Sequence, residues 1–97
     1  MIPLDPSTVL KRRADVRYRR VEGEAVVLRQ SAAEVLVLNG VGADVLDLAD
    51  GVRPLGEWAD ALGGSYEVDR ETLARDLLEF AAELEAAGVL ERVEGGR

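Results

Sequence analysis

The chain has 97 residues, 47% of them hydrophobic and 32% charged, which suits one globular domain with a single core and leaves no room for a second. It contains neither Cys nor His, which excludes disulfides and thiolate metal sites and removes the most common catalytic base. The formal net charge is −7, yet positions 1–30 hold seven of the 12 Lys and Arg residues and only four of the 19 Asp and Glu residues. This uneven distribution of charge opposes nucleic-acid binding over most of the chain and favours a partner with complementary charged patches.

Residues 1–15 contain two prolines and the basic cluster Lys11-Arg12-Arg13, without a clear hydrophobic period. We expect a flexible basic arm that keeps the protein in solution, with docking to a phosphate or a partner as the alternative. The first residues lack the basic region and apolar run of a secretory signal, and no apolar run reaches membrane-spanning length. We therefore expect a cytoplasmic protein that binds no membrane.

Three strand-like runs follow, at residues 16–21, 24–29 and 33–38. Glu22-Gly23 provides a short turn between the first two. Because the links are tight, the runs predict an antiparallel meander whose first and third strands are edges.

The hydrophobic period then becomes helical. Residues 41–48 carry an apolar stripe behind Asn39, a suitable N-cap, and Gly51 is expected to end this first helix. A second, short helix is predicted from Pro54 to about Leu62, ended by two glycines.

The third helix is predicted to begin after Asp69, an N-cap residue, and to end at Gly88. Its apolar stripe consists of Leu73, Leu77, Phe80, Ala81 and Leu84. Residues 89–93 are expected to pack as a short extended piece, and residues 94–97 to form a frayed tail. The fold class is thus α+β, a three-stranded antiparallel sheet followed by three helices, in one domain over residues 16–93.

The stretch from Val16 to Leu90 resembles the PqqD-like family, the recognition elements of ribosomally made and post-translationally modified peptides. The order and spacing of three pieces carry the resemblance. They are Leu38-Asn39 with Gly42-Ala43, Val45-Leu46, Leu48 and Asp50-Gly51; Leu55-Gly56-Glu57-Trp58 through Tyr66; and Asp76-Leu77-Leu78-Glu79-Phe80 with Leu84 and Gly88-Val89-Leu90. The chain departs from the family at Pro54, where a Ser or Thr cap is usual, and at Gly40 and Gly42, which lower helix propensity.

The resemblance implies a winged helix-turn-helix-like fold that is a binding partner, without cofactor or enzymatic activity. It also implies that the third strand and third helix form a cleft, which accepts the leader segment of a precursor peptide as an added strand. The peptide would then be delivered to a modifying enzyme, such as a radical-SAM enzyme, a leader protease or a cyclase.

The residues support this site independently. The first strand is guarded by Arg17, Arg19 and Arg20, whereas the third carries one charge and no proline, as strand addition requires. The expected peptide-binding residues are Ala33, Glu34, Val35, Leu36, Val37, Leu38, Asp76, Leu77, Phe80 and Leu84, with either Val35 or Val37 facing the cleft. The alternative is that the apolar strand residues serve only as core.

Other functional classes remain open. Asp76, Glu79 and Glu83 on the third helix resemble an acid/base or metal cluster, but a solvated helix face is the simpler interpretation, so no catalytic or metal residue is predicted. The main alternative function is a winged-helix DNA-binding domain, which the surplus of carboxylates around Arg70 and Arg75 opposes. A scaffold subunit without a peptide ligand is the third class.

Overall fold

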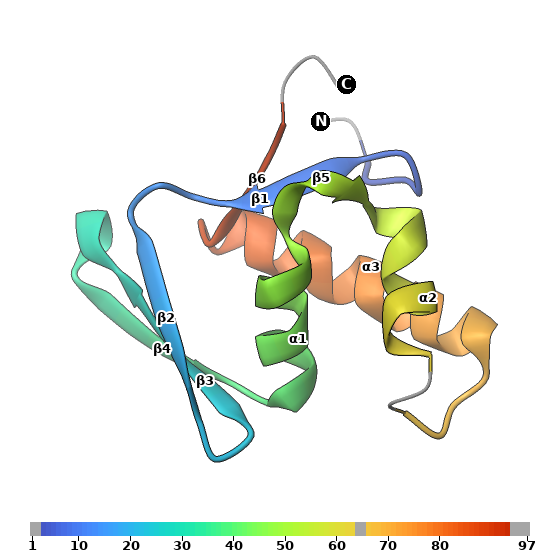
Figure 1. Ribbon diagram of the computed structural model, residues 1–97. Helices are drawn as coiled ribbons and strands as arrows, with labels where there is room; N and C mark the ends of the chain where they lie inside the picture. Colours follow the sequence, from blue (N-terminus) through green and yellow to red (C-terminus); the bar gives the residue numbers. More distant parts are fainter. Residues whose placement is uncertain (1–2, 64–65, 94–97) are drawn as a thin grey trace.

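The computed structural model describes residues 3–63 and 66–93, which form two small sheets packed around three helices (Figure 1). In chain order the elements are β1 (Val9–Arg12), β2 (Val16–Val21), β3 (Glu24–Arg29), the 3-10 turn η1 (Gln30–Ala32), β4 (Glu34–Leu38), α1 (Gly40–Leu48), β5 (Asp50–Pro54), the 3-10 turn η2 (Leu55–Glu57), α2 (Trp58–Leu62), α3 (Arg70–Ala86) and β6 (Leu90–Arg92). The predicted α+β class is confirmed; β1 and β5 are strands that the sequence did not indicate, and β6 lies where it indicated a short extended piece.

The predicted meander is present as the antiparallel sheet β2-β3-β4. Glu22 and Gly23 both have positive φ, 52° and 84°, the backbone of a two-residue hairpin turn that matches the twist of its strands. β4 lies at an edge of this sheet, as predicted for the third strand.

The second sheet has the order β5-β1-β6, and its central strand corrects the prediction of a flexible arm. β1 pairs on one side with β5 and on the other with β6, and the Leu10 side chain is 0% exposed. A four-residue strand with one buried side chain has too little apolar pattern to be found from sequence, and its two partners lie 40 and 80 residues away. The predicted extended piece after Gly88 is β6, whereas residues 94–97 lie outside the described residues.

The helix starts follow their predicted caps. The Asn39 side chain accepts a hydrogen bond from the Gly42 amide at 3.0 Å, and Asp69 accepts one from the Thr72 amide at 2.7 Å. Gly51, expected to end α1, instead lies within β5 with φ of 83°, and the helix ends at Leu48.

The second predicted helix is shorter than expected, because Pro54 belongs to β5 and a 3-10 turn precedes α2. The core lies between the helices and the inner faces of both sheets, around Trp58, Leu46 and Leu77. Among the described residues no helix is long and apolar enough to cross a membrane.

Candidate peptide-binding site

The free edge of β4 is the centre of the candidate site. β4 pairs with β3 on one side, and on its other side no strand pairs with it within residues 3–63 and 66–93. Its outward N–H and C=O groups can therefore receive another chain. Ala33, included in the predicted site, precedes the strand and adopts a left-handed backbone (φ 51°) at the end of η1.

The two faces of β4 differ in a way that corrects one prediction. Leu36 and Leu38 pair with Val27 and Ala25, which are 0% exposed, so these leucines face the helices. Because side chains alternate along a strand, Val35 and Val37 face the opposite way, and both are 62% exposed. Neither valine is on the face toward the helices; the two leucines are.

Gly42 brings β4, α1 and α3 together. A methyl group added there would lie 2.6 Å from Cβ of Leu38 and 2.9 Å from Cζ of Phe80. These distances are shorter than ordinary carbon contacts, so only glycine permits this packing. The glycine that lowers helix propensity thus has a structural role, and it places Phe80 of α3 next to the inner face of β4.

The other predicted site residues of α3 differ in how deeply their side chains are buried. Leu77 and Leu84 are 2% and 4% exposed and belong to the core, so they are not available to line the candidate cleft. Asp76 is exposed and lies one helical turn before the half-buried Phe80, on the same flank. Glu34, at the start of β4, forms an ion pair with Arg29 of β3 at 2.5 Å.

A polar network fastens the sheet to α1. Arg20 of β2 donates from Nη2 to Oδ1 of Asp44 and Oδ2 of Asp47, both at 2.7 Å, while Tyr18 donates to Asp47 and Tyr66 to Asp44. Burial and the hydrogen bond to Asp44 raise the pKa of Tyr66 to about 12. Burial would raise the pKa of Asp47, but the bonds from Tyr18 and Arg20 prevail and lower it.

Sequence reasoning missed this network. It assigned no role to Asp44 or Asp47 and took Arg20 for an edge guard. The pattern was present as Tyr18 and Arg20 at strand spacing and Asp44 and Asp47 at helical spacing. Only the topology shows that these two faces meet, and the network ties β2 and Tyr66 to α1.

The basic cluster is also engaged within the fold. Arg12 donates to the carbonyl oxygen of Leu46 near the end of α1 and lies 5.4 Å from the centre of the Tyr18 ring. Lys11 and Arg13 lie 3.8 Å and 3.6 Å from carboxylate oxygens of Glu91. These side chains therefore stabilise the second sheet.

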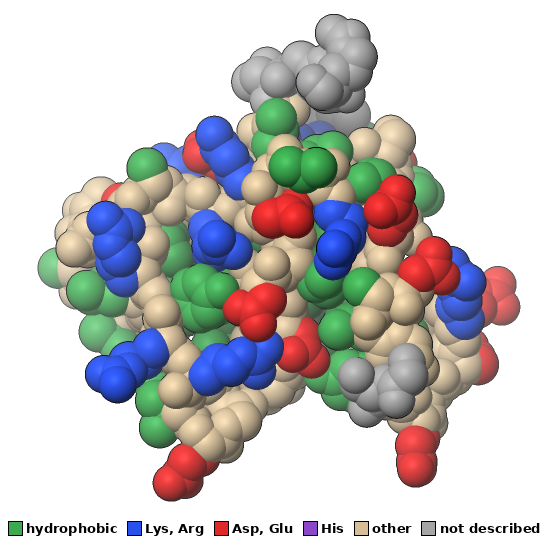
Figure 2. All heavy atoms as spheres, in the orientation of Figure 1, with side chains coloured by type: hydrophobic (Ala, Val, Ile, Leu, Met, Phe, Trp, Pro, Cys, Tyr) green, Lys and Arg blue, Asp and Glu red, His purple; other side chains and the backbone are tan. Residues whose placement is uncertain are grey.

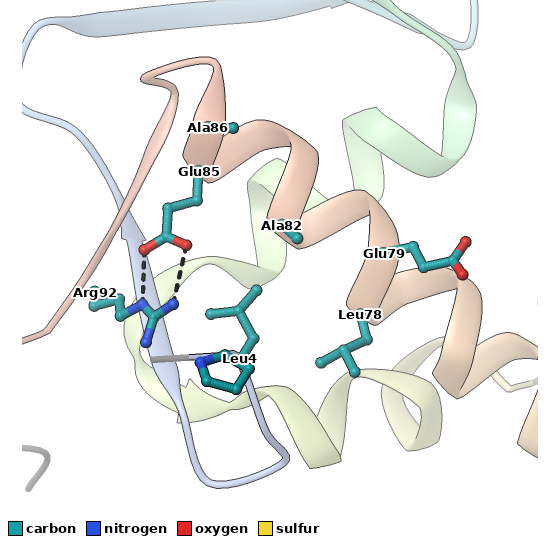
Figure 3. A pocket seen from close by; sticks show the side chains of 8 residues that line it. Leu4, Leu78, Glu79, Ala82, Glu85, Ala86 and Arg92 are labelled. Carbon is teal, nitrogen blue, oxygen red and sulfur yellow. Dashed lines mark hydrogen bonds and ion pairs between the residues drawn. The ribbon is translucent and has the colours of Figure 1, made fainter. Parts of the chain in front are cut away.

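A hollow of the surface lies elsewhere (Figure 3). It has a volume of about 500 Å³ and lies between the N-terminal segment at Leu4 and the part of α3 that carries Leu78, beside the 2.7 Å ion pair of Arg92 with Glu85. Leu78 and Phe80 are two residues apart, about 200° around a helix. The hollow is thus on the opposite flank of α3 from the cleft.

Comparison with known proteins decides the family. The family model described as coenzyme PQQ synthesis protein D (PqqD) matches residues 24–90, from β3 into β6. The chain belongs to the PqqD family. The PqqD match contains both walls of the candidate cleft, β4 and α3.

Relatives within and near the PqqD family agree with this assignment. A PqqA binding protein of Bradyrhizobium diazoefficiens is 29% identical over 82 residues, 84% of this chain and 78% of that protein. TbiB1, solved in complex with the TbiA(beta) leader peptide, superposes with a TM-score of 0.75 at 30% identity, covering 84% of this chain and 94% of the other. A lasso peptide synthetase B1, complexed with its leader peptide, has a TM-score of 0.73 at 24% identity over 84% and 96%, which supports the fold.

No group of three or more metal-ligating side chains is assembled in the described part of the chain.

Proposed function

We propose that this protein is a non-catalytic peptide chaperone, which binds the leader segment of a ribosomally synthesised precursor peptide and delivers it to a modifying enzyme. The free edge of β4 carries the proposal. It is an apolar strand without proline, beside a helix that supplies an aromatic side chain. The names of the relatives point the same way, since one binds PqqA and another was solved with a leader peptide.

The leader would pair antiparallel to residues 34–38 as an additional strand. Main-chain hydrogen bonds to β4 provide affinity for any extended segment, and alternate side chains provide specificity. Those on the inner side would pack against Leu36, Leu38 and Phe80, near the exposed carboxylate of Asp76. Two or three such anchors predict a dissociation constant between micromolar and nanomolar, about −8 to −12 kcal/mol after ordering costs.

DNA binding is less well supported. α3 would be the recognition helix, yet its exposed residues include Glu71, Asp76, Glu79 and Glu83, and Arg70 is engaged by Asp60 of α2. Carboxylates on that helix repel phosphate, and phosphate contacts dominate the affinity for DNA.

The alternation along β4 provides the test. Leu36→Ser removes an inward anchor, whereas Val37→Ser makes a comparable change on the next residue of the same strand, on the opposite face. Calorimetric titration with the leader of the precursor encoded beside this gene should show at least tenfold weaker binding for Leu36→Ser and less than twofold change for Val37→Ser. Equal effects of the two substitutions would contradict the proposed cleft. Circular dichroism checks that both variants are folded.

A further inference from the structure

The outer face of the β2-β3-β4 sheet carries an apolar patch, formed by Val26, Leu28, Val35 and Val37. The register places Val26 beside Val37 and Leu28 beside Val35, all on the face opposite the buried Ala25 and Val27. Val35 and Val37 are each 62% exposed and Leu28 is 38% exposed. Single exposed aliphatic residues are ordinary, whereas these four are contiguous across two neighbouring strands.

Two arginines border this outer patch. Arg17 pairs with Leu28 and Arg19 with Val26, so both continue its two rows onto β2. Neither forms a salt bridge within the described residues, whereas Arg20, on the inner face, contacts two aspartates. In Figure 2 several Lys and Arg side chains lie over this sheet, at the left of the view, whereas most carboxylates lie nearer the helices. Such a border complements a partner surface that carries Asp or Glu beside aliphatic groups.

The outer patch is separate from the proposed peptide site. An added strand would bond to β4 within the plane of the sheet, and its anchors would enter on the inner face, beside Leu36 and Leu38. The outer patch projects from the other face, so a peptide and a second partner can bind together.

The size of the patch narrows the choice of partner. Three strands about 4.8 Å apart and about four residues long cover roughly 200 Å², whereas a stable complex buries about 800 Å² on each partner. A patch of this size supports a weak, transient contact and not a stable dimer. A transient contact with a larger protein, steered by the two arginines, fits the observations better.

We propose that the outer patch, with Arg17 and Arg19, is the docking surface for the modifying enzyme, and that the matching face of the enzyme carries aliphatic side chains bordered by Asp or Glu. This inference rests on the proposed function, because it assigns a surface to the delivery step. The basic sheet of an otherwise acidic chain would orient the protein toward such a face.

The test uses the full chain and the purified modifying enzyme encoded beside the precursor gene, with the binding of each to the chain measured separately. The patch variant is Val26→Ser with Leu28→Ser, both on β3 and outside the leader-binding residues 34–38. The control is Val52→Ser on β5, where an aliphatic residue of the other sheet is 79% exposed. We expect at least tenfold weaker enzyme binding for the patch variant, leader affinity within twofold of wild type, and no change for the control.

Charge reversal tests the border. Arg17→Glu with Arg19→Glu should weaken enzyme binding at low salt, and the wild-type affinity should fall as NaCl is raised. The inference is overturned if the patch variant binds the enzyme like wild type. It is also overturned if enzyme and leader affinities fall together, or if sedimentation shows that the variants abolish a dimer instead. Failure of the wild-type chain to bind the leader would refute the proposed function. Binding of the enzyme is measured without leader, so its result does not depend on leader binding.

Discussion

Gly42→Ala should destabilise the protein, although alanine is the better helix former. The added methyl would lie 2.6 Å from Cβ of Leu38, an atom fixed to the backbone of β4, so the strand itself must move. Ordinary carbon contacts need about 3.5 Å, which implies a displacement of about 1 Å. Overpacking of this kind costs about 1–3 kcal/mol, and the gain in helix propensity returns about 1 kcal/mol. The net loss should be about 0–2 kcal/mol.

Urea unfolding measures this loss directly. For a domain of this size, 1 kcal/mol corresponds to a fall in melting temperature of about 4–8 °C. Leader affinity should fall as well, because the displaced segment is the wall of the cleft. Gly40→Ala is the matched control in the same helix, since its new methyl would meet only the Gly23 carbonyl oxygen, at 3.2 Å. If Gly42→Ala stabilised the protein by about 1 kcal/mol, as in an uncrowded helix, the proposed contact of Leu38, Gly42 and Phe80 would be wrong.

Three further predictions concern the fold and the chemistry. Leu10→Ala should lower the free energy of unfolding by about 2–5 kcal/mol in the same urea assay, because Leu10 is fully buried in the central strand of the second sheet. The control Lys11→Ala should lower it by much less. Small and similar effects of both substitutions would support a flexible arm. The pKa of Asp47 is lower in the folded than in the unfolded state, so its stabilising effect is present above the ordinary carboxyl pKa of 3.8 and is lost as the pH falls through the folded pKa. Thermal melts from pH 7 to pH 2 should therefore lose stability mainly below about pH 4, and the loss should be smaller in Asp47→Asn; an unchanged profile would refute the role of the Asp47 network. Finally, purified protein should leave the precursor peptide unchanged by mass spectrometry, and turnover without an added enzyme would show that the chain is catalytic.

The elements that could be predicted from sequence are those whose signals are local. The turn at Glu22-Gly23, the caps at Asn39 and Asp69 and the long stripe of α3 each lie within a few residues of the structure they specify. The edge position of β4 also followed, because a three-stranded meander leaves its third strand at an edge.

What could not be predicted depends on partners distant in sequence. β1 is a short strand that exists through pairing with β5 and β6, and β5 exists through pairing with β1; neither has an apolar period of its own. The orientation of β4 was equally hidden. All of Val35 to Leu38 are aliphatic, so the sequence shows no alternation, and the buried partners Ala25 and Val27 on β3 decide which face is inside.

The site prediction was incomplete for a related reason. One apolar stripe on α3 contains both Leu77, which is buried, and Phe80, which is half-buried beside β4. Helical spacing groups them, but only the position of α1 and the absence of a side chain at Gly42 separate them.

Amide chemical shifts test the central claim most directly. Isotope-labelled protein is titrated with the leader of the precursor encoded beside its gene, and the shift of each backbone amide is followed to saturation. Strand addition predicts the largest changes over residues 34–38, with smaller ones near Phe80 on α3, and little change in β1 and β6. If the largest shifts fell on β2 or on the basic cluster while β4 stayed unchanged, the peptide would bind elsewhere and the proposed site would be wrong.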